Sequence, residues 1–302
     1  MNKLLAMEVF ARVVETGGFT RAADTLDMPK ATVTTHIQSL ESHLGVKLLN
    51  RSTRRVSVTT DGAAFYERCM RILDDMAETE NALSQARKSV RGRLRVDVGA
   101  TFGREILIPM LPDFFARYPE IRLELGCSDR PVDLIEEGVD CVVRGGVQPD
   151  STLVARKLHS LEFVACATAD YLKRHGTPAH PHDLKKHNCV NYFSAKTGRM
   201  FDWDFIRGSE RIVMSLQGTI ALNDSDAYRA AGRAGLGICK VPAVMVANDL
   251  KRGKLRRVLP EWASSPLPIY VMYPQNRHLS AKVRAFVDWV SGIPLRHGLG
   301  AG

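Results

Sequence analysis

The sequence has no long hydrophobic run. None of its apolar stretches approaches the ~18 residues that a membrane helix needs, which argues against an integral membrane protein. The N-terminus also lacks the unbroken apolar segment of a signal peptide, because Glu8 and Arg12 interrupt it. We therefore expect a cytoplasmic protein with no membrane partner.

Cysteine is scarce and scattered. The six cysteines form no C-x-x-C pair, which excludes a disulfide framework and a zinc cluster. They are interpreted as reduced, mostly buried thiols, with a redox switch at Cys127 or Cys166 as the alternative. Four histidines between residues 175 and 187 lie among prolines and polar residues, which favours a loop over a metal site. We expect no bound metal.

Catalytic and cofactor motifs are missing as well. The sequence contains no Walker loop, nucleophile elbow, H-E-x-x-H helix or dinucleotide fingerprint. The glycines at 232, 235 and 237 follow a predicted helix and precede a strand, which is the wrong order for a dinucleotide site. We therefore expect neither an enzyme nor a cofactor.

What the sequence has in excess is positive charge. Forty-two Lys and Arg residues against 33 Asp and Glu give a net charge of +9, and this surplus favours a polyanionic partner. The length of 302 residues exceeds what one hydrophobic core usually organises, so we expect two or more domains.

The first sixty residues predict three short helices. Apolar residues recur at helical spacing over residues 6–13, and Gly17-Gly18 ends that pattern. Thr20 is placed to cap a second helix over residues 21–26. A third helix is expected from Pro29 to Leu44, where Gly45 follows as a helix terminator.

The third helix has two distinct faces. A helical wheel places Val33, Ile37, Leu40 and Leu44 within a sector of roughly 60°. The outward face carries small or hydrogen-bonding residues and no carboxylate: Ala31, Thr34, Thr35, Gln38 and Ser42. Such a face can approach base edges in a DNA major groove.

A basic, acid-free segment follows this helix. Lys47, Arg51, Arg54 and Arg55 lie in it, and no acidic residue occurs between positions 41 and 61. Alternation over residues 55–58 predicts a β-hairpin, a wing that lays arginines along phosphates. The alternative is a solvated surface loop.

Residues 63–90 predict one long helix with a heptad stripe. The stripe consists of Phe65, Cys69, Ile72, Met76, Thr79, Leu83, Ala86 and Val90. A helix with this pattern needs a partner, and a second copy of the chain is the natural one. The alternative is packing on the chain's own body.

Beyond residue 93 the pattern changes to alternating strands and helices. Strands are expected at 94–98, 121–125, 140–144, 162–167, 236–239 and 269–273. Helices are expected at 104–118, 132–137, 170–174, 227–234, 243–251 and 281–290. This alternation predicts an α/β domain with a largely parallel sheet, divided into two subdomains that face a cleft.

Several segments together resemble LysR-type transcriptional regulators. They are residues 10–23, 31–41, 44–45, 48–51, 59–62, 93–96, 111–119, 134–144 and 232–238. The resemblance implies a multidomain chain: an all-α winged helix-turn-helix, a long dimerising linker helix, and a two-lobed α/β effector domain resembling periplasmic binding proteins. It also implies homotetramers in which small metabolites bound between the lobes alter DNA bending and transcription.

On this resemblance we assign domain boundaries. The winged helix-turn-helix spans 1–60, the linker 61–91, the first lobe 92–162 with 268–293, and the second lobe 163–267. Residues 294–302 are expected to form a disordered tail.

The resemblance also transfers DNA-binding roles to positions of this chain. The base-reading candidates are Lys30, Ala31, Thr32, Thr34, Thr35 and Gln38, with Arg51, Arg54 and Arg55 on the wing. Thr20 is a candidate phosphate ligand at a helix N-terminus. Many relatives have Arg at the position of Thr35, so we expect a different operator half-site.

For the effector cleft, the resemblance indicates residues at strand ends. They are Thr101, Phe102, Gly103, Ser128, Asp129, Arg144, Gly145, Phe193, Ser194, Asn223, Asp224 and Val241. Asp224 has a simple alternative role as a helix cap. Their mixed chemistry predicts a small polar or carboxylated effector. The leading hypothesis is a sequence-specific, ligand-responsive transcription regulator; a redox-sensing regulator and a cytoplasmic small-molecule-binding protein are the alternatives.

Overall fold

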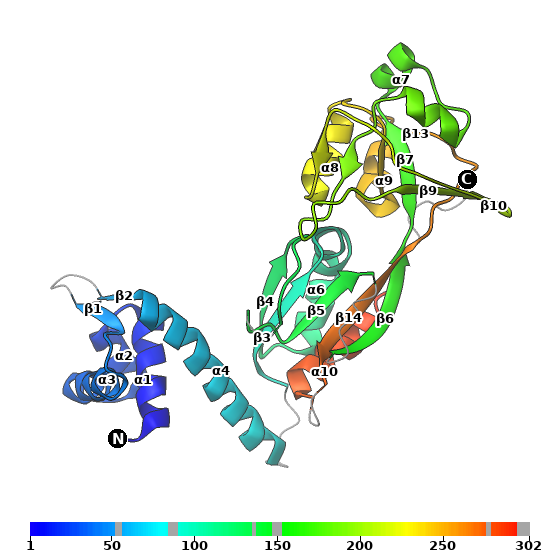
Figure 1. Ribbon diagram of the computed structural model, residues 1–302. Helices are drawn as coiled ribbons and strands as arrows, with labels where there is room; N and C mark the ends of the chain where they lie inside the picture. Colours follow the sequence, from blue (N-terminus) through cyan, green and yellow to red (C-terminus); the bar gives the residue numbers. More distant parts are fainter. Residues whose placement is uncertain (52–55, 84–89, 135–136, 147–152, 276–278, 295–302) are drawn as a thin grey trace. The chain divides into compact units, whose positions relative to one another are not determined.

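The computed structural model describes residues 1–51, 56–83, 90–134, 137–146, 153–275 and 279–294 (Figure 1). The chain divides into two compact units, Met1–Lys88 and Ser89–Gly302, and each is described by itself. In the described part of the chain, no helix is long and apolar enough to cross a membrane.

The N-terminal unit contains the predicted three helices, a β-hairpin and a long helix. Its elements are α1 (Lys3–Thr16), α2 (Phe19–Leu26), α3 (Lys30–Leu44), β1 (Leu49–Arg51), β2 (Val56–Val58) and α4 (Thr60–Leu83). β1 and β2 pair in antiparallel fashion, which confirms the predicted wing hairpin. The core gathers Phe10, Ile37 and Leu40 with Leu48 and Cys69 from the segments that follow α3.

The predicted end of α3 is confirmed and the predicted start of α2 is wrong. Gly45 ends α3 with φ 71°, a left-handed conformation that glycine adopts without steric cost. α2 begins at Phe19 with Gly18 as its N-cap, so Thr20 lies inside the helix and caps nothing. The two glycines thus end one helix and start the next within a single turn.

The stripe along α4 divides into two parts. Cys69 is buried and Phe65 packs on Phe10, with ring centroids 5.7 Å apart, so this end of the helix belongs to the unit's own core. Further along, Ile72 and Met76 are 44% and 41% exposed. The side chain of Leu83 and the whole of Ala86 lie outside the described residues. Own-body packing therefore accounts for the first stripe positions and leaves Ile72 and Met76 uncovered.

The first lobe of the second unit is a five-stranded sheet flanked by helices. Its elements are β3 (Gly92–Val98), α5 (Ala100–Phe102), the π-helical turn η1 (Gly103–Leu107), α6 (Ile108–Arg117), β4 (Ile121–Cys127), β5 (Cys141–Gly145), β6 (Leu153–Leu161), β14 (Leu267–Pro274) and α10 (Ala281–Ser291). The strand order is β4-β3-β5-β14-β6. Phe114 of α6 stacks edge-on against Phe286 and close to Trp289 of α10, which joins these two helices over the sheet.

The second lobe is built from shorter elements. They are β7 (Phe163–Ala167), α7 (Ala169–His175), the 3₁₀ helix η2 (Pro181–Lys186), β8 (Asn191–Tyr192), β9 (Trp203–Arg207), β10 (Glu210–Met214), β11 (Ala221–Leu222), α8 (Ser225–Arg233), β12 (Cys239–Pro242), α9 (Ala243–Lys251) and β13 (Arg256–Arg257). Figure 1 shows two crossings between the lobes: β6 leads into β7, and the segment after β13 returns to β14.

The prediction of a largely parallel sheet holds for β3, β4 and β5 in the first lobe, and the short strands β8 and β11 of the second lobe also pair in parallel. β14 runs antiparallel to β5 and β6, and the sheet β12-β7-β13 is antiparallel throughout. The cause is the double crossing, because strands that enter and leave a lobe run in opposite directions.

Three other local predictions differ from the structure. Residues 135–136 lie outside the described residues, and the described residues of 132–137 belong to no helix; the N–H of Glu137 bonds to the carbonyl of Asp133, and Gly138 has a φ of 63°. The strand expected at 236–239 begins only at Cys239, since the N–H of Leu236 still bonds to the carbonyl of Ala231 at the end of α8. The helix expected from residue 104 starts earlier, so Thr101, Phe102 and Gly103 lie in α5 and η1 rather than in a loop.

Candidate functional site

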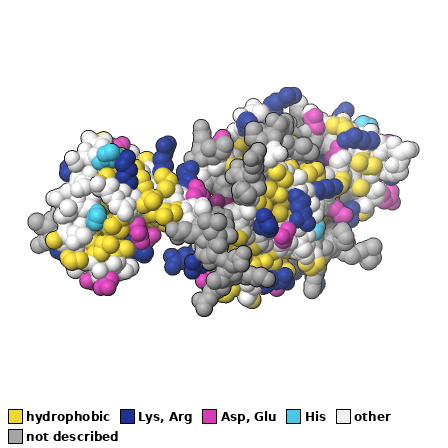
Figure 2. Space-filling view, turned by 90° about the horizontal axis from the view of Figure 1, so that it is seen from below, with side chains coloured by type: hydrophobic (Ala, Val, Ile, Leu, Met, Phe, Trp, Pro, Cys, Tyr) yellow, Lys and Arg dark blue, Asp and Glu magenta, His cyan; other side chains and the backbone are white. Residues whose placement is uncertain are grey.

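Helix α3 presents an outward face without a carboxylate. Val33, Ile37 and Leu40 are buried, as the wheel predicts, while Leu44 at the last turn is 37% exposed. The exposed positions on the opposite side are Lys30, Ala31, Thr35 and Gln38, with Thr32 and Thr34 half-buried. The face of this unit drawn in Figure 2 shows hydrophobic and uncharged side chains with histidines and with scattered acidic and basic ones.

The two central threonines of this face have a fixed orientation. The hydroxyl of Thr34 donates to the carbonyl of Lys30 over 2.9 Å, and that of Thr35 donates to the carbonyl of Ala31 over 2.9 Å. Because each hydroxyl proton is used within the helix, the oxygen is left to accept hydrogen bonds from an approaching molecule. With the Cβ of Ala31, the threonine methyl groups give the face an apolar character that suits thymine methyls.

The wing is anchored to α3 by a buried carboxylate. Glu41 is 3% exposed, and its Oε1 accepts hydrogen bonds from the backbone N–H groups of Leu48 and Leu49 over 3.0 and 3.2 Å. Its Oε2 accepts from Nζ of Lys47 over 2.9 Å. Burial alone would raise the pKa of Glu41, but these hydrogen bonds outweigh it and hold the pKa below its usual range.

The arginines predicted on the wing are not described. Arg54 and Arg55 lie outside the described residues, and only the backbone of Arg51 is described, at the end of β1. Thr20 is exposed in the first turn of α2.

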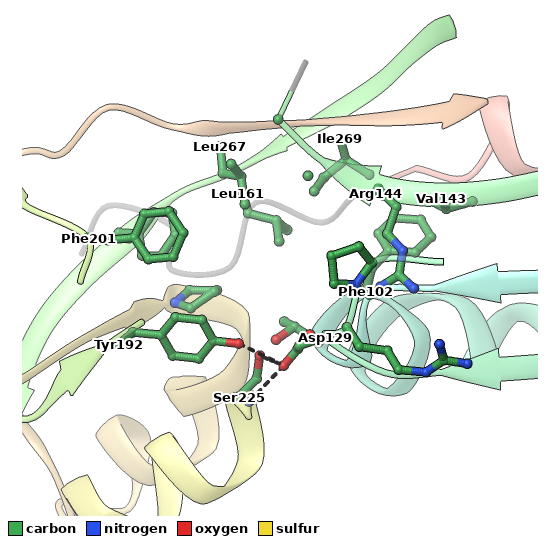
Figure 3. Close-up of a pocket in the computed structure, with 18 of the residues that line it drawn as sticks. Phe102, Asp129, Val143, Arg144, Leu161, Tyr192, Phe201, Ser225, Leu267 and Ile269 are labelled. Carbon is green, nitrogen blue, oxygen red and sulfur yellow. Dashed lines mark hydrogen bonds between the residues drawn. The ribbon is translucent and has the colours of Figure 1, made fainter. Parts of the chain in front are cut away.

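A cleft of about 780 Å³ lies between the two lobes of the second unit (Figure 3). Pockets of this size and apolar composition are typical of small-molecule sites. The predicted candidates that line it are Thr101, Phe102, Asp129, Arg144 and Gly145. The other predicted candidates do not line the cleft: Gly103, Ser128, Phe193, Ser194, Asn223, Asp224 and Val241.

The candidates away from the lining have structural contacts. Asp224 accepts a hydrogen bond from the N–H of Ala227 over 2.8 Å, so it is the cap of α8 that the sequence offered as an alternative. Val241 is fully buried in the core of the second lobe. Ser194 is bonded through its backbone N–H to the carbonyl of Arg199 in a turn. Gly103 lies so close to Cys127 that a Cβ would come 2.8 Å from its Sγ.

Asp129 connects the two lobes. Its Oδ2 accepts hydrogen bonds from the N–H of Ser225 over 2.7 Å, from the Ser225 hydroxyl, and from the Tyr192 hydroxyl over 3.2 Å (Figure 3). Its Oδ1 accepts from the N–H of Ala100 over 3.1 Å in the first lobe. A carboxylate from the first lobe thus occupies the N-terminal turn of α8, where backbone N–H groups favour negative charge. Burial and the Asp129 carboxylate together raise the pKa of the Tyr192 hydroxyl.

Two further ion pairs join the lobes at the edge of the cleft. Arg229 of α8 bonds to Glu105 of η1 over 2.9 Å, and Arg104 of η1 pairs with Asp226 of α8. With Asp129, these pairs hold the N-terminal half of α8 against the turn that follows β3.

The basic groups that line the cleft are each paired with a carboxylate. Arg144 pairs with Asp97 and also donates to the carbonyl of Ser128. Lys240 lies 2.8 Å from Oδ1 of Asp204. Burial lowers the pKa of Arg144 and of Lys240, and the paired carboxylates oppose this effect.

The contact between Lys240 and Asp204 also affects the pKa of Asp204. Burial would raise the pKa of Asp204, but hydrogen bonds from Lys240 and Ser265 lower it to about 2. Arg130, the third basic residue of the described lining, donates a 2.9 Å hydrogen bond to Glu137.

Several residues of the cleft were not among the predicted candidates. They are Arg130, Tyr192, Phe201, Asp204, Ser225 and Lys240. A helix cap signal at Asp224-Ser225 was visible, but nothing local indicated that Asp129 would reach Ser225 from 96 positions away. Long-range packing places these side chains together.

The cysteines named in the redox alternative lie in different environments. Cys166 and Cys239 are both buried, with their Sγ atoms 3.6 Å apart, and the pKa of Cys239 is raised by its hydrogen bond with Cys166 and by burial. Cys127 is exposed, but burial of its thiol and the charge of Asp97 raise its pKa. Because the thiolate is the reactive form, these environments do not favour the redox alternative, which stays a hypothesis.

The histidine cluster has structural partners. The Nδ1 of His180 accepts a hydrogen bond from the N–H of His182 at the start of η2, and its ring packs edge-on against Trp262. Among the described residues, no group of three or more His, Cys, Asp or Glu is placed to hold a metal ion.

Comparison with known proteins identifies both units. The description "Bacterial regulatory helix-turn-helix protein, lysR family" matches residues 4–63, and "LysR substrate binding domain" matches residues 87–292. The chain belongs to the LysR family of transcriptional regulators. The winged helix-turn-helix is its DNA-binding domain and the two-lobed domain its effector-binding domain.

Relatives of this LysR-type regulator cover nearly its whole length. It is 42% identical over 290 residues, 96% of this chain and 92% of the relative, to the HTH-type transcriptional repressor PA14_22550 of Pseudomonas aeruginosa. It is 34% identical over 289 residues, 95% of this chain and 93% of the relative, to the HTH-type transcriptional activator AaeR of Escherichia coli. The relatives thus include both a repressor and an activator.

Solved full-length structures show the same architecture. The virulence activator AphB of Vibrio cholerae matches with a TM-score of 0.60 at 32% identity, over 96% of this chain and 98% of that one. CrgA of Neisseria meningitidis matches with a TM-score of 0.60 at 33% identity, over 95% and 97%.

Proposed function

We propose that this LysR-type regulator binds a specific operator through α3 and its wing, and that a small molecule in the interlobe cleft modulates this binding. In the proposal, α4 pairs two chains, two such dimers form a homotetramer, and the protein acts in the cytoplasm without enzymatic activity. We propose the same domain boundaries as in the sequence analysis: DNA-binding domain 1–60, linker 61–91, first lobe 92–162 with 268–293, and second lobe 163–267.

The observation that carries this proposal is the outward face of α3. Surface helices usually carry Glu and Lys, whereas this face has Ala31, Thr35 and Gln38 exposed and no carboxylate. Gln38 suits a bidentate contact with adenine, and Ala31 suits a thymine methyl. Lys30 at the start of the helix is placed for a phosphate, which positions the helix without reading sequence.

The cleft supports the ligand-responsive part of the proposal. Its volume suits a small molecule, and the groups that close it come from both lobes. A molecule that binds between the lobes changes the spacing of Asp129 and α8, and this change provides the differential contact that an allosteric effect requires.

The test is binding of the full chain to the DNA upstream of its own gene. Affinity is measured while salt is titrated and excess unrelated duplex is added. We expect specific binding to be at least about 10³-fold tighter than binding to unrelated duplex. Gln38→Ala is expected to weaken specific binding by about 1–3 kcal/mol and to leave non-specific binding unchanged.

Thr25→Ala is the matched control for the threonines of the reading face. Thr25 is exposed on α2, outside the proposed reading face, and its hydroxyl makes the same bond to the carbonyl four residues earlier, at 2.8 Å. Thr34→Ala should weaken specific binding while Thr25→Ala does not. Two results would contradict the reading role of α3. One is an equal effect of the two variants, and the other is wild-type binding to the upstream DNA that unrelated duplex removes completely.

A further inference from the structure

The walls of the interlobe cleft are mainly apolar and rich in aromatic rings. Six aromatic residues line it: Phe102, Phe163, Tyr192, Phe201, Trp203 and Tyr228. Aliphatic side chains from β5, β6 and β14, among them Val143, Leu161 and Ile269, complete the wall (Figure 3). Surfaces of this kind gain free energy by covering an apolar ring, through burial and through edge or offset stacking.

The lining offers no uncompensated positive charge among its described residues. Its basic groups are Arg130, Arg144 and Lys240, and each is bonded to a carboxylate of the chain: Glu137, Asp97 and Asp204. The lining itself contains four aspartates, at positions 129, 133, 202 and 204, against these three basic residues. A carboxylate that enters the cleft therefore loses water without gaining a free cation, and it meets an excess of negative charge.

The helix N-terminus at the cleft is also occupied. The N–H of Ser225 would attract an anion, but it already bonds to the Asp129 carboxylate over 2.7 Å, as does the Ser225 hydroxyl. An anionic ligand would have to displace a carboxylate that is covalently part of the protein and also bonded to Ala100 and Tyr192.

We propose that the cleft selects an uncharged aromatic compound and discriminates against carboxylates. This inference rests on the proposed function of the cleft as an effector site, and it replaces the expectation of a polar or carboxylated metabolite. The paired charges provide the selectivity, and the aromatic wall provides the affinity.

The first experiment compares matched probes on the full wild-type chain. The pairs are benzamide with benzoate, 2-naphthamide with 2-naphthoate, and indole-3-carboxamide with indole-3-carboxylate, each titrated at pH 7.5 by ligand-observed NMR and calorimetry. We expect the amide to bind about tenfold or more tightly than the acid in at least the two-ring pairs, because only the acid pays for burying an unpaired charge. Tighter binding of the acids, or no binding of any probe, overturns the proposal.

The second experiment removes a neutralising carboxylate. Asp204→Asn leaves Lys240 without its acid while it keeps a side chain of the same shape, so the ratio of amide to acid affinity should fall by about tenfold. Asp288→Asn is the control, because Asp288 lies on α10 with its side chain 65% exposed and does not line the cleft. Its ratio should match the wild type. An unchanged ratio in Asp204→Asn contradicts the proposal.

Asp129→Asn provides a second test if Asp204→Asn does not fold. Loss of the Asp129 charge at the N-terminus of α8 should also shift the ratio toward the acids. Circular dichroism verifies that each variant is folded before its ratio is used. An unchanged ratio in a folded Asp129→Asn variant contradicts the proposal.

The same preparations separate this proposal from the proposed function. Operator affinity is measured for each preparation without probes, and then with the amide and with the acid of the tightest-binding pair. Specific DNA binding that responds to an acid but not to its amide would overturn the ligand class and retain the regulator. Specific DNA binding that no cleft-bound probe alters would count against the ligand-responsive function, whichever class binds.

Discussion

At the residue scale, Glu41 is the group that connects the reading helix to the wing. It lies on α3, three residues beyond Gln38, and its buried carboxylate accepts hydrogen bonds from the backbone of Leu48 and Leu49, where β1 begins. A buried charge is tolerated because hydrogen bonds satisfy both of its oxygens. The orientation of the start of the wing relative to α3 thus depends on one buried side chain.

Glu41→Gln is expected to destabilise the N-terminal unit by about 1–3 kcal/mol at pH 7, since charged hydrogen bonds become neutral ones in a buried place. The pKa of Glu41 is lowered in the fold, so its contribution is present above the unfolded pKa and is lost as the pH falls through the folded pKa. The difference from wild type should therefore narrow in acid. Denaturant unfolding followed by circular dichroism at several pH values measures it. Glu8→Gln, at an exposed position on α1, should show no such difference; a difference that does not change with pH would contradict the role of the charge.

Single residues were the hardest scale to predict from the sequence. Five effector candidates line the cleft, because strand ends of an α/β lobe converge on one edge. The sequence did not indicate Tyr192, Ser225 or Asp204, since each acquires its place through a contact made far along the chain. The prediction that Thr20 caps α2 was wrong for a local reason: Gly17 and Gly18 let α2 begin two residues earlier.

At the element scale, α3 presents methyl groups where larger residues would donate hydrogen bonds. The hydroxyl groups of Thr34 and Thr35 donate hydrogen bonds to the carbonyls of Lys30 and Ala31. In the proposed function the helix would read by methyl contact and by accepting hydrogen bonds, which favours A·T pairs with a thymine methyl near Ala31.

This reading mode predicts that replacement of thymidine by deoxyuridine within the operator half-site weakens binding by about 1 kcal/mol per contacted base. The uracil carbonyls are unchanged, so only the methyl contact is lost. Fluorescence anisotropy on substituted duplexes measures the change, and substitutions outside the half-site serve as the control. A half-site indifferent to every deoxyuridine substitution would show that α3 does not read methyl groups.

The exposed part of α4 is the second element with a testable role. Ile72 and Met76 lie on the heptad stripe beyond the part that packs in the N-terminal core, and nothing in the described unit covers them. Met76→Glu should shift the sedimentation profile toward smaller species at micromolar concentration, because it places like charges opposite each other in the dimer seam. Arg68→Ala, at an exposed position off the stripe, should leave the profile unchanged. Unaltered assembly in Met76→Glu would place the dimer contact elsewhere.

Most elements were predictable because periodicity is a local property. Helices α1, α3, α9 and α10 begin and end within a few residues of their predicted bounds, and the wing hairpin forms as expected. The strand directions of the sheet β12-β7-β13 were not predictable, since the double crossing that makes them antiparallel is a property of the whole chain path. The described residues of 132–137 belong to no helix, and Gly138, which follows them, has a φ of 63°.

At the scale of the whole effector domain, the lobes are held together by charges and hydrogen bonds. Asp129 with Ser225 and Glu105 with Arg229 all join the same two segments. Val244 of α9 adds apolar packing against the cores of both lobes. In the proposed function, a molecule that binds between the lobes changes their spacing and alters these contacts.

Asp129→Ala should release this closure. The N–H of Ser225 loses its acceptor, and its hydrogen exchange is expected to accelerate by about fivefold or more, corresponding to about 1 kcal/mol. Hydrogen–deuterium exchange with mass spectrometry, read on peptides from the start of α8, measures this effect. Asp170→Ala on α7, remote from the lining of the cleft, is the control. Unchanged exchange at Ser225 would show that Asp129 does not hold the lobes together.

The central claim is that α3 gives this regulator its DNA sequence preference. The most direct measurement is selection of bound duplexes from a random pool by the full wild-type chain, in parallel with its Thr34→Ala and Thr25→Ala variants. We predict one enriched inverted repeat for the wild type and for Thr25→Ala, and a loss of preference at specific positions of each half-site for Thr34→Ala. A pool without enrichment, or an enriched sequence that Thr34→Ala leaves unchanged at every position, would contradict it.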